Sequence, residues 1–204
     1  KILVISQFTM ALCLVTATLA VFMQIYFMKS QNLGFSIEQV FVVRAPSVRE
    51  ANFKSSLHTF KAEILKNPGI SHMSVVTEVP GNQIYWDAGG IHPVGSDESK
   101  NYQIVGIDYD FVDLFRTPLI AGRNFLTAFP SDTTALILNE TAVKWMGFTH
   151  ADSAIGQQVN YWDIMYTIIG VMKDYHQQSP KAAFEPHIYR LLPFGRGVRG
   201  MFAF

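Results

Sequence analysis

The segment Asp174-Tyr175-His176 holds the residue types closest to a catalytic pair in this sequence. A carboxylate beside an imidazole could orient the ring for general-base chemistry. The sequence has no G-x-S-x-G nucleophile elbow, and its single cysteine, Cys13, lies in an uncharged stretch. We therefore favour a turn in which Asp174 and His176 bond to local backbone groups, and we assign no catalytic residue.

The stretch from Gly195 to Gly200, GRGVRG, has the glycine spacing of dinucleotide-binding and phosphate-binding loops. A phosphate loop needs Lys and then Ser or Thr after its last glycine, whereas Met201 and Phe202 follow here. A dinucleotide loop needs a following helix and a downstream acid, and the sequence ends instead. We predict a basic turn between strands and no cofactor.

The histidines give no pattern typical of a metal site. No two of them stand two or four residues apart, the spacing that would place two imidazoles side by side on a strand or helix. We therefore assign no metal ligand among the six: His58, His72, His92, His150, His176 and His187.

Three tryptophans, Trp86, Trp145 and Trp162, could line a groove for a peptide or a lipid. We favour packing in the core instead, because large amphipathic aromatic side chains fill protein interiors routinely.

The charge balance excludes one class of function. Sixteen Lys and Arg side chains match sixteen Asp and Glu side chains, so the formal net charge is zero. A nucleic-acid-binding protein normally needs a basic surface to displace counterions from phosphates. The balance of 49% hydrophobic and 16% charged residues is more apolar than a soluble domain usually shows, and none of the charged residues lies between positions 2 and 28.

Residues 2–28 form the uncharged stretch, which as a helix would be about 40 Å long and so exceed the roughly 30 Å core of a bilayer. It is too long for the apolar region of a signal peptide, and no Ala-x-Ala cleavage site follows it. A core helix of this length would rarely be uncharged. We predict a membrane-spanning helix. Gly34 suits the left-handed position that ends a helix, so we expect a stalk that continues through residues 29–32 into the folded part.

A strand-helix-strand unit should follow the stalk. Residues 39–45 and 70–79 are rich in β-branched side chains, and Ser47 and Glu50 fit a capping box for the helix between them. A right-handed crossover would make the two strands parallel in one sheet. The helix carries an apolar stripe of Phe53, Leu57, Phe60 and Ile64, opposite Arg49, Lys54, His58 and Lys61.

The remaining sequence is rich in short strands and turns. A short helix over residues 139–146 has Asn139 as its N-cap and Gly147 as its stop, which also explains the glycosylation-like triplet Asn139-Glu140-Thr141. Two late strands, 186–192 and 200–204, should return to the first lobe. The other expected strands are 102–108, 135–138, 159–161 and 166–171.

Several stretches in order resemble one family. They are SQNLGF, ISHMSVVTEVPG, IDYDFVDLF, PLIAGRNF, LILNETAVKWMGF, AIGQQV, IIGVMKDYHQQS and EPHIY. Together they resemble the N-terminal half of a MacB/FtsX-type ABC transporter permease, namely the first transmembrane helix and the MacB-like periplasmic core domain.

This resemblance implies an α+β fold with a transmembrane and stalk helix (1–34) and a two-lobe periplasmic domain. The first lobe would be a βαβ lobe made of residues 35–95 and of residues 186–204, which return to it. The second, a mostly-β lobe, would be inserted between them at residues 96–185. We expect the sequence to be a piece of a longer protein, because it starts without Met and ends within a predicted strand.

The same resemblance implies a non-catalytic subunit of the bacterial inner membrane, with residues after about 34 in the periplasm. An ABC ATPase on a partner chain, a second permease copy and possible periplasmic partners would complete it. ATP hydrolysis would drive export of peptides, lipids or drugs, or mechanotransmission. Two alternatives stay open: the ligand-sensing ectodomain of a membrane receptor, and a membrane-tethered hydrolase that uses Asp174 or His176.

Overall fold

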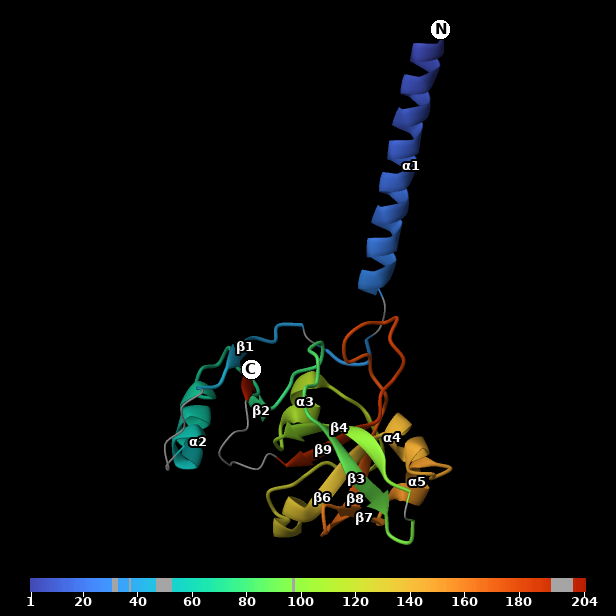
Figure 1. Ribbon diagram of the computed structural model, residues 1–204. Helices are drawn as coiled ribbons and strands as arrows, with labels where there is room; N and C mark the ends of the chain where they lie inside the picture. The colour runs from blue at the N-terminus through green and yellow to red at the C-terminus, as the bar shows by residue number, and fades with distance from the viewer. Residues whose placement is uncertain (31–32, 37, 47–52, 97, 192–199) are drawn as a thin grey trace. The chain divides into compact units, whose positions relative to one another are not determined.

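The chain divides into two compact units, Lys1–Leu33 and Gly34–Phe204, and each is described by itself. The computed structural model (Figure 1) describes residues 1–30, 33–36, 38–46, 53–96, 98–191 and 200–204. The predicted capping box at Ser47 and Glu50 and the predicted stalk residues 31 and 32 lie outside these ranges.

The first unit consists of one long helix, α1 (Ile2–Ser30). Its segment Ile2–Met28 contains an 18-residue window with a mean hydropathy of 2.1, and the segment is long and apolar enough to cross a membrane. The hydroxyls of Ser6, Thr9 and Thr18 donate to carbonyls three or four residues back along the helix. These polar groups therefore need no partner outside the helix, which suits an apolar surrounding. The predicted apolar helix is confirmed.

The second unit begins with a three-stranded sheet. Its strands are β1 (Val42–Arg44), β10 (Met201–Ala203) and β2 (Ser74–Val76), in that order. The central strand β10 is antiparallel to both neighbours, so β1 and β2 run parallel to each other. The parallel strands and the return of residues 200–204 to this sheet are both as predicted.

Helix α2 (Phe53–Ile64) packs on this sheet through the apolar stripe that the sequence predicts. Leu57 is buried with Met73 and Phe202, and the rings of Phe60 and Phe202 lie 5.5 Å apart. The spacing of 3.6 residues per turn therefore places one face of α2 against the sheet.

Seven further strands form a larger sheet in the order β5-β8-β6-β9-β4-β3-β7, and β7 also pairs with β8. The pairings therefore close β8, β6, β9, β4, β3 and β7 into a ring, to which β5 is added. The strands are β3 (Asp87–Pro93), β4 (Lys100–Ile107), β5 (Leu119–Gly122), β6 (Ala135–Asn139), β7 (Gln158–Tyr161), β8 (Ile164–Met172) and β9 (His187–Leu191).

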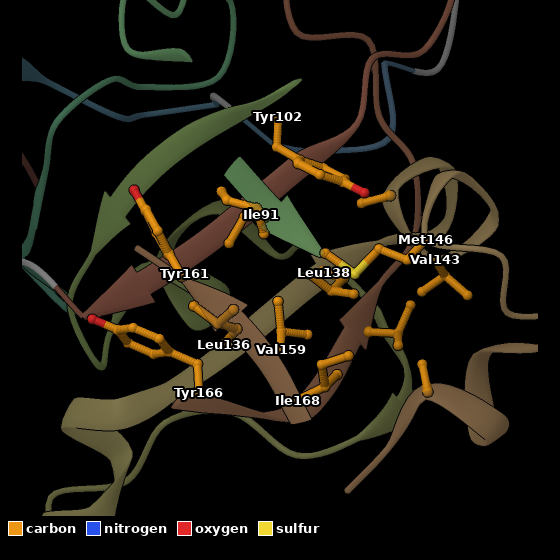
Figure 2. Packing of buried hydrophobic residues seen from close by; sticks show 14 of the residues in the cluster. Ile91, Tyr102, Leu136, Leu138, Val143, Met146, Val159, Tyr161, Tyr166 and Ile168 are labelled. Atoms are coloured by element: carbon orange, nitrogen blue, oxygen red, sulfur yellow. The ribbon is translucent and has the colours of Figure 1, made fainter. Parts of the chain in front are cut away.

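Strand β6 shows how the ring divides the core. Leu136 and Leu138 pack with Val159 and Ile168 in one cluster, shown in Figure 2. Ala135 and Ile137, on the opposite face of β6, belong to a second cluster that includes the aromatic side chains of α3 (Phe111–Phe115). Because successive side chains of a strand point to opposite faces, β6 contributes residues to both clusters.

Helix α4 (Glu140–Trp145) begins and ends as the sequence predicts. The Asn139 side-chain oxygen accepts a hydrogen bond from the Ala142 amide at 2.9 Å, and Gly147, just past the end, has a φ of +88°. The sequence did not predict β3, β5, α3, the 3-10 helix η1 (Pro130–Thr134) or α5 (Ala151–Ala154). The three helical elements among them have only four or five residues each.

Strand β9 differs from expectation. The sequence predicts that it returns to the first lobe, but it lies inside the ring, parallel to β4 and antiparallel to β6. Its residues read as a strand in the sequence, yet nothing local specifies which strands it joins. The residue limits of the two lobes stay a prediction.

The tryptophans also differ in part. Trp86 packs partly buried against the ring cluster, but Trp145 and Trp162 are 46% and 60% exposed, so core packing was wrong for these two. Trp162 and Asp163 form the β7–β8 turn, both with positive φ, which turns the indole outward and lets its N–H donate to the Gly89 carbonyl at 2.8 Å.

Gly122 provides a test of the β5–β8 packing. A Cβ at this position would lie 2.2 Å from the Ile169 carbonyl oxygen, whereas a Cβ at Gly147 would meet nothing within 4 Å, and both residues have positive φ. We expect Gly147→Ala to lower the free energy of unfolding by about 1 kcal/mol and Gly122→Ala by about 3 kcal/mol or more. Urea unfolding in detergent micelles, followed by tryptophan fluorescence, measures both; equal losses would contradict the packing.

Candidate functional site

Asp108, directly after β4, lies where the three-stranded sheet meets the ring. Its side chain is only 11% exposed. One carboxylate oxygen accepts from the Ser74 hydroxyl, and the other accepts from the Val75 amide at 3.0 Å, both on β2. A buried carboxylate is stable only when such donors surround it. We call Asp108, Ser74 and Lys61 the inter-sheet joint.

Lys61 completes the joint from α2. Its ammonium lies 3.0 Å from Asp108 Oδ2 and also donates to the Asp110 carboxylate. The sequence predicts Lys61 on the face of α2 opposite the apolar stripe. Its ammonium group instead contacts two carboxylates that lie 47 and 49 residues away in the sequence. Burial lowers the pKa of Lys61, but the neighbouring carboxylates outweigh this effect and raise the pKa above its ordinary value, so the ammonium stays charged.

Backbone hydrogen bonds continue the joint along the two strands. The Thr77 amide donates to the Gly106 carbonyl, and the Gly106 amide donates to the Thr77 hydroxyl, each at 2.9 Å. The residue that follows β2 is therefore fixed to β4 of the ring.

The second unit starts at Gly34 and Phe35, which pack against the segment after β8. The Phe35 and Tyr175 rings meet edge to face at 5.4 Å, and the Ser36 amide donates to the Phe115 carbonyl at 2.9 Å. Gly34 has a φ of +86°, as predicted, and a Cβ there would lie 2.9 Å from Tyr175 Cβ. The chain thus joins the core domain at a defined contact.

The segment Asp174-Tyr175-His176 does not form a catalytic pair. Asp174 accepts from the Thr141 amide at 3.1 Å and from the Thr141 hydroxyl at 2.7 Å, so its carboxylate serves the first turn of α4. The predicted bonds of Asp174 to local backbone are therefore wrong, because its partner lies 33 residues away. The His176 ring instead packs on Phe184, with ring centres 4.6 Å apart.

His187, at the start of β9, is buried in a polar network. Its Nε2 lies 3.1 Å from Gln103 Oε1, and its Nδ1 lies 3.3 Å from the Tyr189 hydroxyl. Burial lowers the pKa of His187 to about 4, so the imidazole is neutral at physiological pH. It packs as a structural side chain rather than as an accessible base.

No group of three His, Cys, Asp or Glu side chains within the described ranges could hold a metal ion. The glycine motif lies outside these ranges except for Gly200, which directly precedes β10. Sequence reasoning missed the inter-sheet joint, because its members are far apart in the chain and each is a common residue type.

Comparison with known proteins assigns this arrangement to a family. Residues 8–195 match the model of the MacB-like periplasmic core domain. The chain belongs to this family. Members of this family are components of ABC transporter permeases. No curated protein matches the chain.

Two solved structures share the fold at low identity, and a third is less similar. The periplasmic region of MacB from Actinobacillus actinomycetemcomitans is 17% identical, with a TM-score of 0.53 over 85% of this chain and 77% of that chain. The extracellular domain of the noncanonic ABC-type transporter YknZ from Gram-positive bacteria is 13% identical, with a TM-score of 0.50 over 81% of each chain. A domain assigned to a permease of Porphyromonas gingivalis is 15% identical, with a TM-score of 0.49 over 69% of this chain and 64% of that chain.

The family match and the fold therefore confirm the resemblance seen in the sequence. The chain is a MacB-like periplasmic domain with an N-terminal apolar helix, which describes a membrane-anchored component whose folded part is periplasmic.

The inter-sheet joint predicts unequal effects of two similar substitutions. Asp108→Asn should lower the free energy of unfolding by about 2–3 kcal/mol, because the amide keeps one acceptor oxygen and leaves the other donors unpaired. Asp110→Asn, at a side chain that is 36% exposed, should cost under about 1 kcal/mol. Urea unfolding of both variants tests this difference, and the joint would be refuted if Asp110→Asn cost as much as Asp108→Asn.

The buried imidazole of His187 predicts a pH-dependent stability. Its folded pKa of about 4 lies below the ordinary 6.5, so the unfolded chain binds the proton more readily and stability falls as pH drops through this window. The loss attributable to His187 between pH 7 and pH 4 should be about 3 kcal/mol.

Thermal unfolding at several pH values measures this loss, and His187→Gln should remove it. His58→Gln, at an exposed position, is the matched control. NMR of the His187 ring protons gives its pKa directly, and a midpoint near 6.5 would contradict the assignment.

Proposed function

We propose that this chain is the first membrane span and periplasmic core of an ABC transporter permease that converts cytoplasmic ATP hydrolysis into work outside the membrane. The work would be export of peptides, lipids or drugs, or mechanical control of a periplasmic protein. The core domain would act without catalysis of its own, as a body moved by its membrane helix.

One observation carries this proposal. The family match starts at residue 8, inside α1, and continues to residue 195. Helix and core domain therefore belong to one family module, as a mechanical coupler requires. A cleaved leader would instead precede the family domain.

Two contacts of the core domain support a mechanical role. Gly34 and Phe35 pack on Tyr175, so a displacement of residue 34 acts directly on the segment after β8. The inter-sheet joint then ties the ring to the three-stranded sheet through Asp108. Force applied at Gly34 would thus reach both sheets.

The proposal needs partners beyond this chain. An ABC ATPase would supply the energy, a second permease copy would complete the membrane part, and a periplasmic protein could receive the motion. No observation favours the alternative of a receptor ectodomain, since the family match concerns permeases.

An insertion at the start of the core domain tests the coupling. We expect four Gly-Ser residues between Leu33 and Gly34 to reduce transport by the complete complex at least about tenfold, because a flexible segment absorbs the displacement instead of passing it on. ATP hydrolysis and transport should both be measured in proteoliposomes, and hydrolysis should persist.

The same insertion after Gly95, in an exposed turn between β3 and β4, is the matched control and should leave transport unchanged. Full transport with the insertion at Leu33 would contradict rigid coupling.

A further inference from the structure

The segment that links β8 to β9 lines a small pocket of about 40 Å³ that is open to solvent. Its lining comes entirely from residues 175–187, and it includes His176, Gln177, Phe184 and Glu185. At this size the pocket suits a single small functional group, such as the end of one side chain.

Hydrogen bonds hold this segment at both ends. At its start, Asp174 is bonded to Thr141, and the Gln177 amide nitrogen donates to the carbonyls of Val79 and Asn82, at 3.0 and 2.7 Å. At its other end, the Asn139 side-chain amide donates to the Glu185 carbonyl at 2.8 Å. These bonds fix both ends of the pocket wall.

The pocket contains a buried acceptor without a donor. Gln177 is only 7% exposed, and its side-chain oxygen has no hydrogen-bond partner among the described residues, although its nitrogen has two. The Nδ1 atom of His176 is likewise buried without a partner in this part of the chain. An unpaired buried acceptor destabilises the folded state, so a ligand that donates a hydrogen bond here is favoured.

Charge and aromatic groups indicate which donor fits. Glu185 is the one charged side chain in the lining, and no Lys or Arg lines the pocket within the described part of the chain. Phe184 is 44% exposed and stacks on His176, so it offers an aromatic face. A carboxylate and an aromatic face beside an unpaired amide oxygen together favour a cation with N–H donors.

We infer that this pocket binds an alkylammonium group, either of a lysine side chain on a peptide or of a free amine. Gln177 would accept a hydrogen bond from the ammonium, Glu185 would neutralise its charge, and Phe184 would pack on its alkyl stem. A neutral apolar ligand would leave the Gln177 oxygen unpaired, and an anion would be repelled by Glu185. The inference goes beyond the proposed function and does not rest on it.

Titration of the full chain in detergent micelles tests the site. The probe is n-butylammonium chloride, and the readout is the NMR shift of the Gln177 side-chain amide. We expect a saturable shift with n-butylammonium, and at least tenfold weaker binding of n-butanol and n-butyrate, which match its length. Equal binding of butanol, stronger binding of butyrate or no shift up to 50 mM ammonium (roughly the weakest affinity expected for a single functional group) would overturn the inference.

Two variants separate the contributions of charge and ring. Glu185→Gln should weaken binding about three- to fivefold, and Phe184→Leu about two- to fivefold, as expected for a partly exposed ion pair and a cation–π contact. A glutamine at 185 still accepts from Gln103, as Glu185 does, so the wall is kept. Glu63→Gln, an exposed acid on α2, is the control and should bind as wild type; wild-type binding by both pocket variants would overturn the inference.

A second ligand distinguishes the two sources of the ammonium. Nα-acetyl-lysine amide carries the same group on a peptide unit. Tighter binding than n-butylammonium supports the inference and assigns the site to a protein or peptide partner. Equal or weaker binding, with n-butylammonium still bound, supports it and assigns the site to free amines. Because transport is not measured here, failure of this test is distinct from failure of the coupling proposal.

Discussion

The burial of one carboxylate at the junction of two sheets is the constraint on which the core domain depends. Asp108 is surrounded by donors from β2 and α2, while its own backbone continues β4 of the ring. Separation of the sheets would leave this charge without its donors, a cost of several kcal/mol. The two sheets are therefore held in one arrangement, and the second unit can behave as a single body.

The ring gives that body its stiffness. Strand β8 pairs with β5, β6 and β7, and this closure leaves few free strand edges along which the sheet could slide. The core on both faces of β6 adds close packing to the hydrogen bonds. A stiff body held at Gly34 is the form that the proposed lever requires.

Local features were predictable from the sequence. The uncharged run specifies α1. The Asn139 side chain and Gly147 specify the two ends of α4, and Gly34 has the left-handed backbone conformation that the sequence predicts. The spacing of the apolar residues along α2 predicts which face of this helix packs on the sheet. Each of these rests on interactions within about four residues, which a single sequence contains.

Long-range pairings were not predictable. The partners of Lys61 and of Asp174 lie 47 and 33 residues away in the sequence. Strand β9 likewise pairs with β4 and β6, which are far from it in the sequence. The outward position of Trp162 follows from a turn with positive φ at a residue that rarely adopts it. The family resemblance supplied the architecture that local patterns could not, but it did not supply the inter-sheet joint.

The central claim, that the core domain moves as one body, is tested most directly by electron–electron distance measurements in the assembled transporter. Spin labels at Glu63 on α2 and Asp152 on α5 report on the arrangement inside the domain, and both positions are exposed. A label at Asp152 paired with one on the ATPase reports on movement of the whole domain. The account predicts that ATP turnover changes the second distance and leaves the first unchanged. A change in the first distance as large as that in the second, or no change in either, would contradict it.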